Sequence, residues 1–166
     1  MKRFIVMLAT TAMAINVSAQ KTITLSKEVS GADEIITNYW NNSTAPHSNE
    51  ETKDEARDKD GHLINTSQTV FYLYQAPSDK ATGQAVVILP GGGYGKVCIE
   101  REGFALAEYF KSIGVTALVV KYRLPNNGHR EVPLEDAQAG LEYLRTNAKK
   151  LGIDPAKVGI AGSSAG

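Results

Sequence analysis

The sequence predicts an α/β fold in which a mostly parallel sheet carries helices on both faces. Three segments are predicted to be parallel strands of a buried sheet: residues 85–89, which are continuously apolar, and residues 115–120 and 157–161. Two amphipathic stretches, residues 102–113 and 133–151, alternate with these segments. The resulting order of strand, helix, strand, helix, strand indicates parallel strands joined by right-handed crossovers.

A further strand is predicted before the first of these segments. β-Branched and aromatic residues alternate between residues 69 and 74, as they do in strands. Residues 76–84 then supply the Pro, Ser, Asp and Gly that are typical of a turn. This strand therefore joins the sheet ahead of the alternating strands and helices.

Apolar spacing predicts both helices. The stretch 102–113, which Gly114 ends, has one apolar face formed by Leu106, Phe110 and Ile113. The longer helix is predicted to begin at Pro133, a residue suited to the first helical position, and to end before Gly152. Its apolar stripe comprises Leu134, Ala137, Leu141, Leu144, Ala148 and Leu151.

The first nineteen residues have the pattern of a secretory signal peptide. Two basic residues precede an apolar run at residues 4–15, and small residues follow at positions 17–19. Cleavage is predicted between Ala19 and Gln20, which would place the mature protein in the periplasm or outside the cell. The run is shorter than the roughly 20 residues that cross a bilayer, so no membrane association beyond export is expected.

The remainder divides into two predicted parts. Residues 20–66 form a polar N-terminal segment, and residues 67–166 form an α/β domain. The run from Glu50 to Gly61 mixes charges of both signs and is expected to be a solvated loop. Tyr39 and Trp40 are the large aromatic residues of the polar segment, and we expect them to pin it to the main body.

Composition excludes several classes of function. Eighteen basic residues balance eighteen acidic ones, without the clustered Lys and Arg that bind nucleic acid or anionic membranes. The one cysteine, Cys98, can form neither an internal disulfide nor a CxxC metal site, and it is expected to be a small buried residue. Neither a metal nor a cofactor is predicted, and the oligomeric state is left open.

A G-x-S-x-G pattern, Gly162-Ser163-Ser164-Ala165-Gly166, follows the third buried strand directly. On a sharp strand-to-helix turn this pattern holds a serine hydroxyl clear of the sheet, and larger flanking side chains would clash. Ser164 is therefore the predicted nucleophile, and Ser163 a structural neighbour. Such a pattern also occurs in ordinary glycine-rich turns, so its place after a buried strand is what favours the catalytic interpretation.

A second glycine-rich loop, Pro90-Gly91-Gly92-Gly93-Tyr94, follows the first buried strand. Its unshielded N–H groups could bind the oxyanion of a tetrahedral intermediate or a phosphate. A P-loop requires glycine where Pro90 stands and Ser or Thr at Val97, and a dinucleotide loop requires a small residue at Lys96. Phosphate binding is thus disfavoured, and the oxyanion interpretation agrees with the serine turn.

These motifs resemble a known family. From about Gln68 to Gly166 the sequence is similar to bacterial α/β-hydrolase esterases related to acetylxylan and feruloyl esterases. The similarity is carried by AVVILPGGGY, VVKYRLP, VPLEDAQAGLEYLR and LGIDPAKVGIAGSSAG. It implies a three-layer α/β-hydrolase fold, truncated at the C-terminus, with oxyanion N–H groups from Gly92 or Gly93 and from Ala165. Pro90 departs from the histidine that precedes these glycines in the wider hormone-sensitive-lipase-like group.

The same resemblance implies residues that this chain does not contain. In α/β-hydrolases an Asp or Glu and then a His follow the nucleophilic serine, whereas His47, His62 and His129 all precede Ser164. A serine hydroxyl is a poor nucleophile without a base to take its proton. The chain as given is therefore expected to be inactive.

The predicted function is that of a serine carboxyl-ester hydrolase that deacylates plant polysaccharides or oligosaccharides, with a small-molecule or oligosaccharide ester as its partner. A prolyl-oligopeptidase-like serine peptidase and a non-catalytic fragment are the alternatives. Arg123 and Asp136 are predicted to form an ion pair that buttresses the glycine loop rather than to contact substrate. The sequence specifies neither the acyl group nor the sugar.

Overall fold

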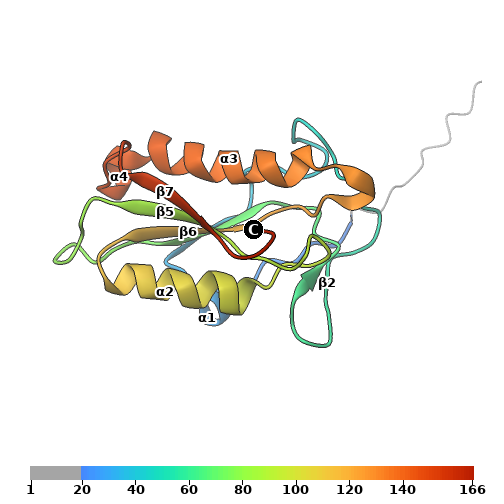
Figure 1. The fold of residues 1–166 in the computed structure, drawn as a ribbon, viewed down its shortest axis with the longest axis horizontal. Coiled ribbons are helices and arrows are strands. Elements are labelled where there is room, and N and C mark those ends of the chain that lie inside the picture. The colour runs from blue at the N-terminus through green and yellow to red at the C-terminus, as the bar shows by residue number, and fades with distance from the viewer. Residues whose placement is uncertain (1–19) are drawn as a thin grey trace, which may run out of the picture.

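The computed structural model describes residues 20–166, so the predicted signal peptide lies outside the described residues. Its centre is a sheet of five strands: β1 (Glu34–Ile36), β4 (Val70–Tyr74), β5 (Ala85–Leu89), β6 (Thr116–Lys121) and β7 (Val158–Gly162). The strand order is β1-β4-β6-β5-β7. Figure 1 labels three of these strands, β6, β5 and β7. Strands β6, β5 and β7 pair in parallel, whereas β4 pairs antiparallel with β6 and with β1. The predicted α/β fold is confirmed, and the four predicted strands lie within one residue of the observed ones.

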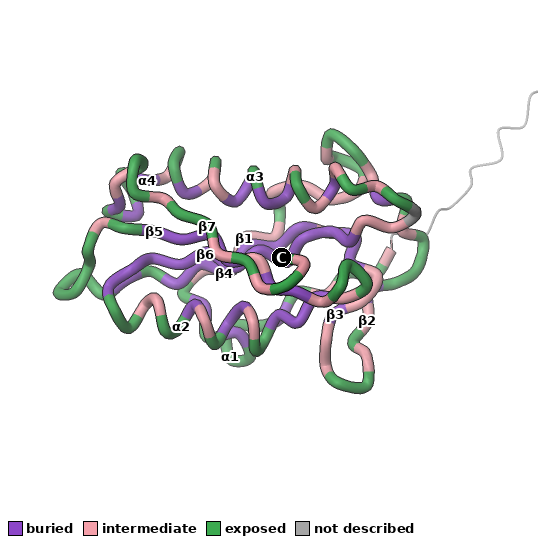
Figure 2. The backbone as a smooth tube through the Cα atoms, viewed as in Figure 1, coloured by how far each residue is buried: buried purple, intermediate pink, exposed green. Residues whose placement is uncertain are grey.

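Helices cover both faces of the sheet. Helix α2 (Ala105–Ser112) lies on one face and α3 (Glu131–Thr146) on the other, which gives three layers (Figure 1). Strands β4 and β6 are buried along their whole length, whereas β7 is partly or fully exposed (Figure 2). The core therefore centres on the middle of the sheet.

Both helices differ from prediction at their ends. The first begins earlier, as a π-helical turn, η1 (Glu100–Phe104), that continues into α2. The second begins at Glu131, so Pro133 lies inside its first turn. It is interrupted at Asn147, whose side-chain amide donates to the carbonyl of Tyr143 (2.8 Å), and resumes as α4 (Ala148–Leu151). Asparagine commonly interrupts helices because its side chain competes for backbone hydrogen bonds.

Leu134 and Ile113 do not pack in the core as the apolar stripes predicted. Leu134 is 58% exposed and Ile113 is 49% exposed. Ile113 is the residue at which α2 ends, and Leu134 lies in the first turn of α3, where it lines a cavity. Helical spacing alone does not show where a helix extends beyond the sheet that covers it.

The polar N-terminal segment contains a short helix, α1 (Lys27–Ser30), the edge strand β1, and a hairpin of β2 (Ala56–Arg57) and β3 (Leu63–Ile64). The prediction of a solvated loop at residues 50–61 is wrong for Glu55, which is buried. Its carboxylate accepts hydrogen bonds from the N–H groups of Ile23 (2.6 Å) and Ser67 (2.8 Å). It also pairs with the Lys121 ammonium at 2.6 Å.

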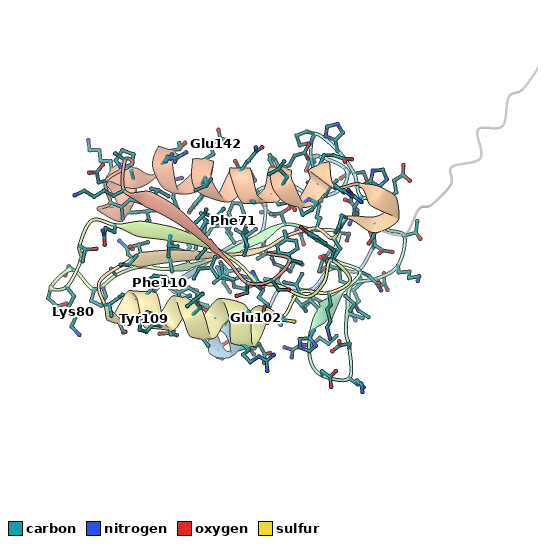
Figure 3. All side chains as sticks on the ribbon, in the orientation of Figure 1. Phe71, Lys80, Glu102, Tyr109, Phe110 and Glu142 are labelled. Carbon is teal, nitrogen blue, oxygen red and sulfur yellow. The ribbon has the colours of Figure 1, made fainter. Side chains whose placement is uncertain are left out.

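Tyr39 and Trp40 hold the segment to the main body, as predicted. The ring of Tyr39 packs on Phe71 of β4 with centroids 4.9 Å apart, and Phe71 is labelled in Figure 3 beside the α3 layer. The indole N–H of Trp40 donates to Oδ1 of Asp136 in α3 (2.6 Å). Within residues 20–166, no helix has the length and apolar character needed to cross a bilayer.

Candidate active site

The G-x-S-x-G turn lies at the carboxyl end of β7, directly beside the end of β5. Gly162 is paired with Leu89 in the parallel register, and the N–H of Ser163 donates to the Leu89 carbonyl (3.1 Å). The N–H of Gly166 then donates to the carbonyl of Ser163 (2.8 Å), which closes the turn. Ser164 at its tip is exposed and has a φ of +54°. Such backbone strain in a serine directly after a parallel strand is the geometry of a nucleophile elbow.

Steric contacts explain the glycines that flank this serine. A Cβ atom on Gly162 would collide with the carbonyl group of Gly166, and one on Gly166 would collide with the carbonyl group of Leu89. Residues with side chains at either position would force the turn away from β5. The elbow can therefore lie against the sheet only with glycine at both positions.

The glycine loop after β5 touches the elbow. A Cβ atom on Gly91 would lie 3.1 Å from Cβ of Ser164 and would collide with the carbonyl oxygen of Ser163. The two loops thus lie side by side at the carboxyl edge of the sheet, near the C-terminus marked in Figure 1. The structure brings together Ser164, Ala165 and the loop that carries Gly92 and Gly93.

The carbonyl groups of the glycine loop are bonded away from the elbow. Cys98 N–H donates to the Gly91 carbonyl (2.9 Å), and the N–H groups of Gly95 and Lys96 donate to the Gly92 carbonyl, each at 3.2 Å. Because the N–H and C=O of a trans peptide point in opposite directions, these bonds turn the N–H groups of Gly92 and Gly93 the other way.

Backbone donors of both loops remain without a partner. Among the described residues, five N–H groups of these loops make no hydrogen bond, those of Gly92, Gly93, Tyr94, Ser164 and Ala165. The Gly91 N–H, in contrast, is bonded to Glu102 Oε2 at 2.8 Å. The free groups include those predicted to stabilise an oxyanion. Preorganised donors of this kind stabilise developing negative charge without having to reorient during the reaction.

A cavity of about 600 Å³ opens beside the elbow. Its walls are mainly apolar, and they include Tyr94, Tyr122, Leu134, Ala137 and Ala165, with Arg130 as the charged residue. This volume lies within the range of small-molecule sites in proteins. The cavity reaches the predicted oxyanion donor Ala165, so a molecule bound in it would lie next to Ser164.

No base lies against the serine within residues 20–166. The Ser164 hydroxyl makes no hydrogen bond to any described residue, and every histidine pairs with acidic residues elsewhere. The pairs are His47 with Glu135, His62 with Asp58 (3.1 Å), and His129 with Glu131 (3.2 Å) and Glu50 (3.5 Å). The hydrogen bond to Glu135 raises the pKa of His47 above its usual range.

One cluster offers metal-ligand atoms. Ligand atoms of Asp58, Asp60 and His62 lie within 4.8 Å of one another. The Asp58 carboxylate already accepts the N–H groups of Asp60 and His62 (2.9 Å each), and the Lys96 ammonium lies 3.4 Å away. These bonds close a turn and place a cation beside the acids, so the cluster is explained without an ion.

Arg123 and Asp136 form the predicted ion pair, but they do not contact the glycine loop. Both side chains are fully buried, with Arg123 Nη2 2.8 Å from Asp136 Oδ1. The Arg123 N–H also donates to Oδ2 (2.7 Å). Two further partners, the indole of Trp40 and the carbonyl of His47, belong to the N-terminal segment, and Glu135 Oε2 of α3 lies 3.6 Å from Arg123 Nη2. The pair fastens that segment to the sheet.

Cys98 is buried, as expected, and burial raises the pKa of its thiol. It contributes to the site through its backbone N–H rather than its sulfur. Glu102 and Tyr122 also bond to the glycine loop, and no sequence pattern points to either one. The sequence features that could have suggested them are weak. Glu102 is an acidic residue early in the helix after the loop, and Tyr122 directly follows the neighbouring strand.

The chain matches the BD-FAE family over residues 71–166. It is 39% identical to the acetylxylan esterase of Xylanibacter ruminicola over 100 residues, which are 60% of this chain and 20% of that protein. It is 34% identical to endo-1,4-beta-xylanase B of Butyrivibrio fibrisolvens over 93 residues, which are 54% of this chain and 14% of that protein.

Solved structures share the fold. The acetyl ester-xyloside bifunctional hydrolase of Caldicellulosiruptor lactoaceticus matches with a TM-score of 0.56 and 28% identity over 79% of this chain and 42% of that one. A thermophilic esterase of Thermogutta terrifontis matches with a TM-score of 0.54 and 22% identity over 84% of this chain and 42% of that one. The chain thus spans less than half the length of each protein it matches here.

Proposed function

The chain belongs to the BD-FAE family, and we propose that it supplies the nucleophile and oxyanion hole of a serine carboxyl-ester hydrolase. One observation carries the proposal: Ser164 lies on a strained turn against a glycine loop whose N–H groups at Gly92 and Gly93 bond to no residue between positions 20 and 166. Relatives named acetylxylan esterase and acetyl ester-xyloside hydrolase support an acylated plant polysaccharide, or its oligomers, as the substrate.

The geometry supports an acyl-transfer mechanism. Ser164 Oγ would attack the ester carbonyl carbon while a histidine takes the hydroxyl proton. The carbonyl oxygen becomes an oxyanion that the N–H groups of Gly92, Gly93 and Ala165 stabilise. Collapse of this intermediate releases the sugar alcohol, which takes the proton from histidine, and water then hydrolyses the acyl-serine by the same steps in reverse order.

We place the base and its acidic partner outside the described residues. The three histidines at positions 47, 62 and 129 pair with acids and make no bond to Ser164. The family order also puts the acid and the histidine after the serine. Export is a further part of the proposal, and N-terminal sequencing of the mature protein should find Gln20 as its first residue. Retention of Met1 would contradict it.

Serine-dependent hydrolysis tests the proposal. The complete protein encoded by the gene should cleave p-nitrophenyl acetate and release acetate from acetylated xylo-oligosaccharides, and Ser164→Ala should abolish both activities. A fluorophosphonate probe should label Ser164, as shown by mass spectrometry of the labelled peptide. Residues 20–166 alone should hydrolyse p-nitrophenyl acetate no faster than their Ser164→Ala variant. Unchanged hydrolysis by the complete Ser164→Ala variant would refute the proposed nucleophile.

A further inference from the structure

We infer that Glu102 and Tyr122 are positioning residues for the oxyanion donors of the glycine loop. Glu102 bonds to the N–H and Tyr122 to the carbonyl of the Pro90–Gly91 peptide group, and we call this pair of hydrogen bonds the grip. The grip fixes the orientation of the donors. The catalytic consequence rests on the proposed function, whereas the grip itself is a property of the structure. Neither residue touches the reacting serine by any hydrogen bond within residues 20–166.

Tyr122 holds the carbonyl end of this peptide. It follows β6 directly, is 2% exposed, and its hydroxyl donates to the Pro90 carbonyl at 2.5 Å. Burial raises the pKa of Tyr122, so the hydroxyl keeps the proton that it donates. A buried carbonyl would otherwise lack this partner, which makes the bond costly to lose.

Glu102 holds the N–H end. Its Oε2 accepts the Gly91 N–H at 2.8 Å from the π-helical turn η1, and Figure 3 labels it at the end of the α2 layer nearest the elbow. Backbone hydrogen bonds also connect this turn to the loop. The Glu102 N–H donates to the Cys98 carbonyl (3.1 Å), and the Cys98 N–H donates to the Gly91 carbonyl (2.9 Å).

The two bonds together prevent one particular motion. Consecutive glycines rotate freely, and Gly92 already has a φ of +144°, so an ungripped loop could flip its peptide planes. The bonds to the Gly91 and Gly92 carbonyls orient the next two peptide planes, and the fixed Pro90–Gly91 plane anchors the start of this arrangement. Together they leave the N–H groups of Gly92 and Gly93 free. Oxyanion donors are effective because they already point to the position where negative charge develops in the transition state.

Substitutions in the complete protein separate this role from simple folding. Glu102→Ala removes the acceptor, Glu102→Gln keeps an oxygen that can accept the Gly91 N–H, and Tyr122→Phe removes only the hydroxyl. Glu100→Gln is the matched control, since Glu100 lies in the same turn with a 53% exposed side chain that pairs with Arg57. The catalytic constant is normalised to sites titrated with a fluorophosphonate, so unfolded molecules do not contribute.

Glu102→Ala and Tyr122→Phe are expected to lower kcat about 10- to 100-fold with KM changed less than threefold. The reason is that incorrectly oriented oxyanion donors weaken binding of the transition state but not of the substrate. Glu102→Gln should recover at least a third of the wild-type kcat, and Glu100→Gln should match wild type. Equal losses in Glu102→Gln and Glu102→Ala, or a kcat in Glu102→Ala within twofold of wild type, would overturn the inference.

A second measurement does not depend on activity. In protein labelled with ¹⁵N-glycine, the Gly91 amide should exchange with solvent at least tenfold faster in Glu102→Ala than in Glu102→Gln. If Ser164-dependent hydrolysis is absent while this difference is present, the proposed function fails and the grip stands. An unchanged Gly91 amide in Glu102→Ala would refute the grip, whatever the activity.

Discussion

The loops after β5 and β6 leave the same edge of the sheet, yet they satisfy their polar groups in opposite ways. After β6, Arg123 is fully buried and paired with Asp136, and the hydroxyl of Thr66 donates to the Tyr122 carbonyl (2.9 Å). After β5, Gly92 and Gly93 keep N–H groups that bond to no described residue. Gly92 is partly buried and Gly93 is exposed, so these free donors are open to a bound molecule, which suits this loop to bind a reacting group.

Removing the buried ion pair of Arg123, in the loop after β6, should have the largest effect on stability. Asp136→Ala leaves the buried Arg123 guanidinium with only the more distant Glu135 carboxylate at 3.6 Å, which costs about 3–5 kcal/mol of unfolding free energy. Urea denaturation of the complete protein measures it. Lys150→Ala is the control, because the Lys150–Glu34 pair is exposed and should change stability by less than about 1 kcal/mol. Equal small effects would show that the buried pair is not needed for the fold.

Disturbing the contact between the glycine loop and the elbow should have the next largest effect. A methyl group at Gly91 would collide with the Ser163 carbonyl, so Gly91→Ala should destabilise the protein by about 1–3 kcal/mol and lower kcat at least tenfold. Gly95→Ala is the matched control, since nothing lies within 4 Å of a Cβ there. Similar kcat values for the two variants would contradict the observed contact.

Relieving the strain at the elbow should produce a smaller change of opposite sign. Ser164 has a φ of +54°, which glycine adopts without steric cost. Ser164→Gly should therefore raise the unfolding free energy by about 1 kcal/mol relative to Ser164→Ala, although both lack the nucleophile. The difference in urea midpoint between the two inactive variants measures it. A less stable glycine variant would show that the turn is unstrained.

The smallest expected effect concerns His47, which pairs with Glu135 at the surface. The hydrogen bond raises the pKa of His47 in the folded protein, so the pair stabilises the fold at pH values below the unfolded pKa. This contribution is lost as the pH rises through the raised folded value. NMR titration should show a lower His47 pKa in Glu135→Gln. An identical pKa in both proteins would rule out the interaction.

Sequence patterns predicted the parts of the fold that depend on local composition. Residues 85–89 were predicted as a buried strand because they form a continuous apolar run, whereas the strand predicted at residues 157–161 forms but is partly or fully exposed. The elbow was recognisable because its glycines, serine and preceding strand are contiguous. Contacts between residues apart in the sequence were not predictable: the Glu55 carboxylate pairs with Lys121, and the Glu102 carboxylate accepts the N–H of Gly91.

The Lys121–Glu55 pair has a consequence for where the folding unit begins. The family match starts at residue 71, but a polypeptide that began there would carry an ammonium group in its interior with no counterion. Burial already lowers the pKa of Lys121, and without Glu55 the lysine would have to give up its proton or draw water into the sheet. Evolution can therefore vary the hairpin and loops of residues 20–66, but it can discard that segment only by also replacing the lysine.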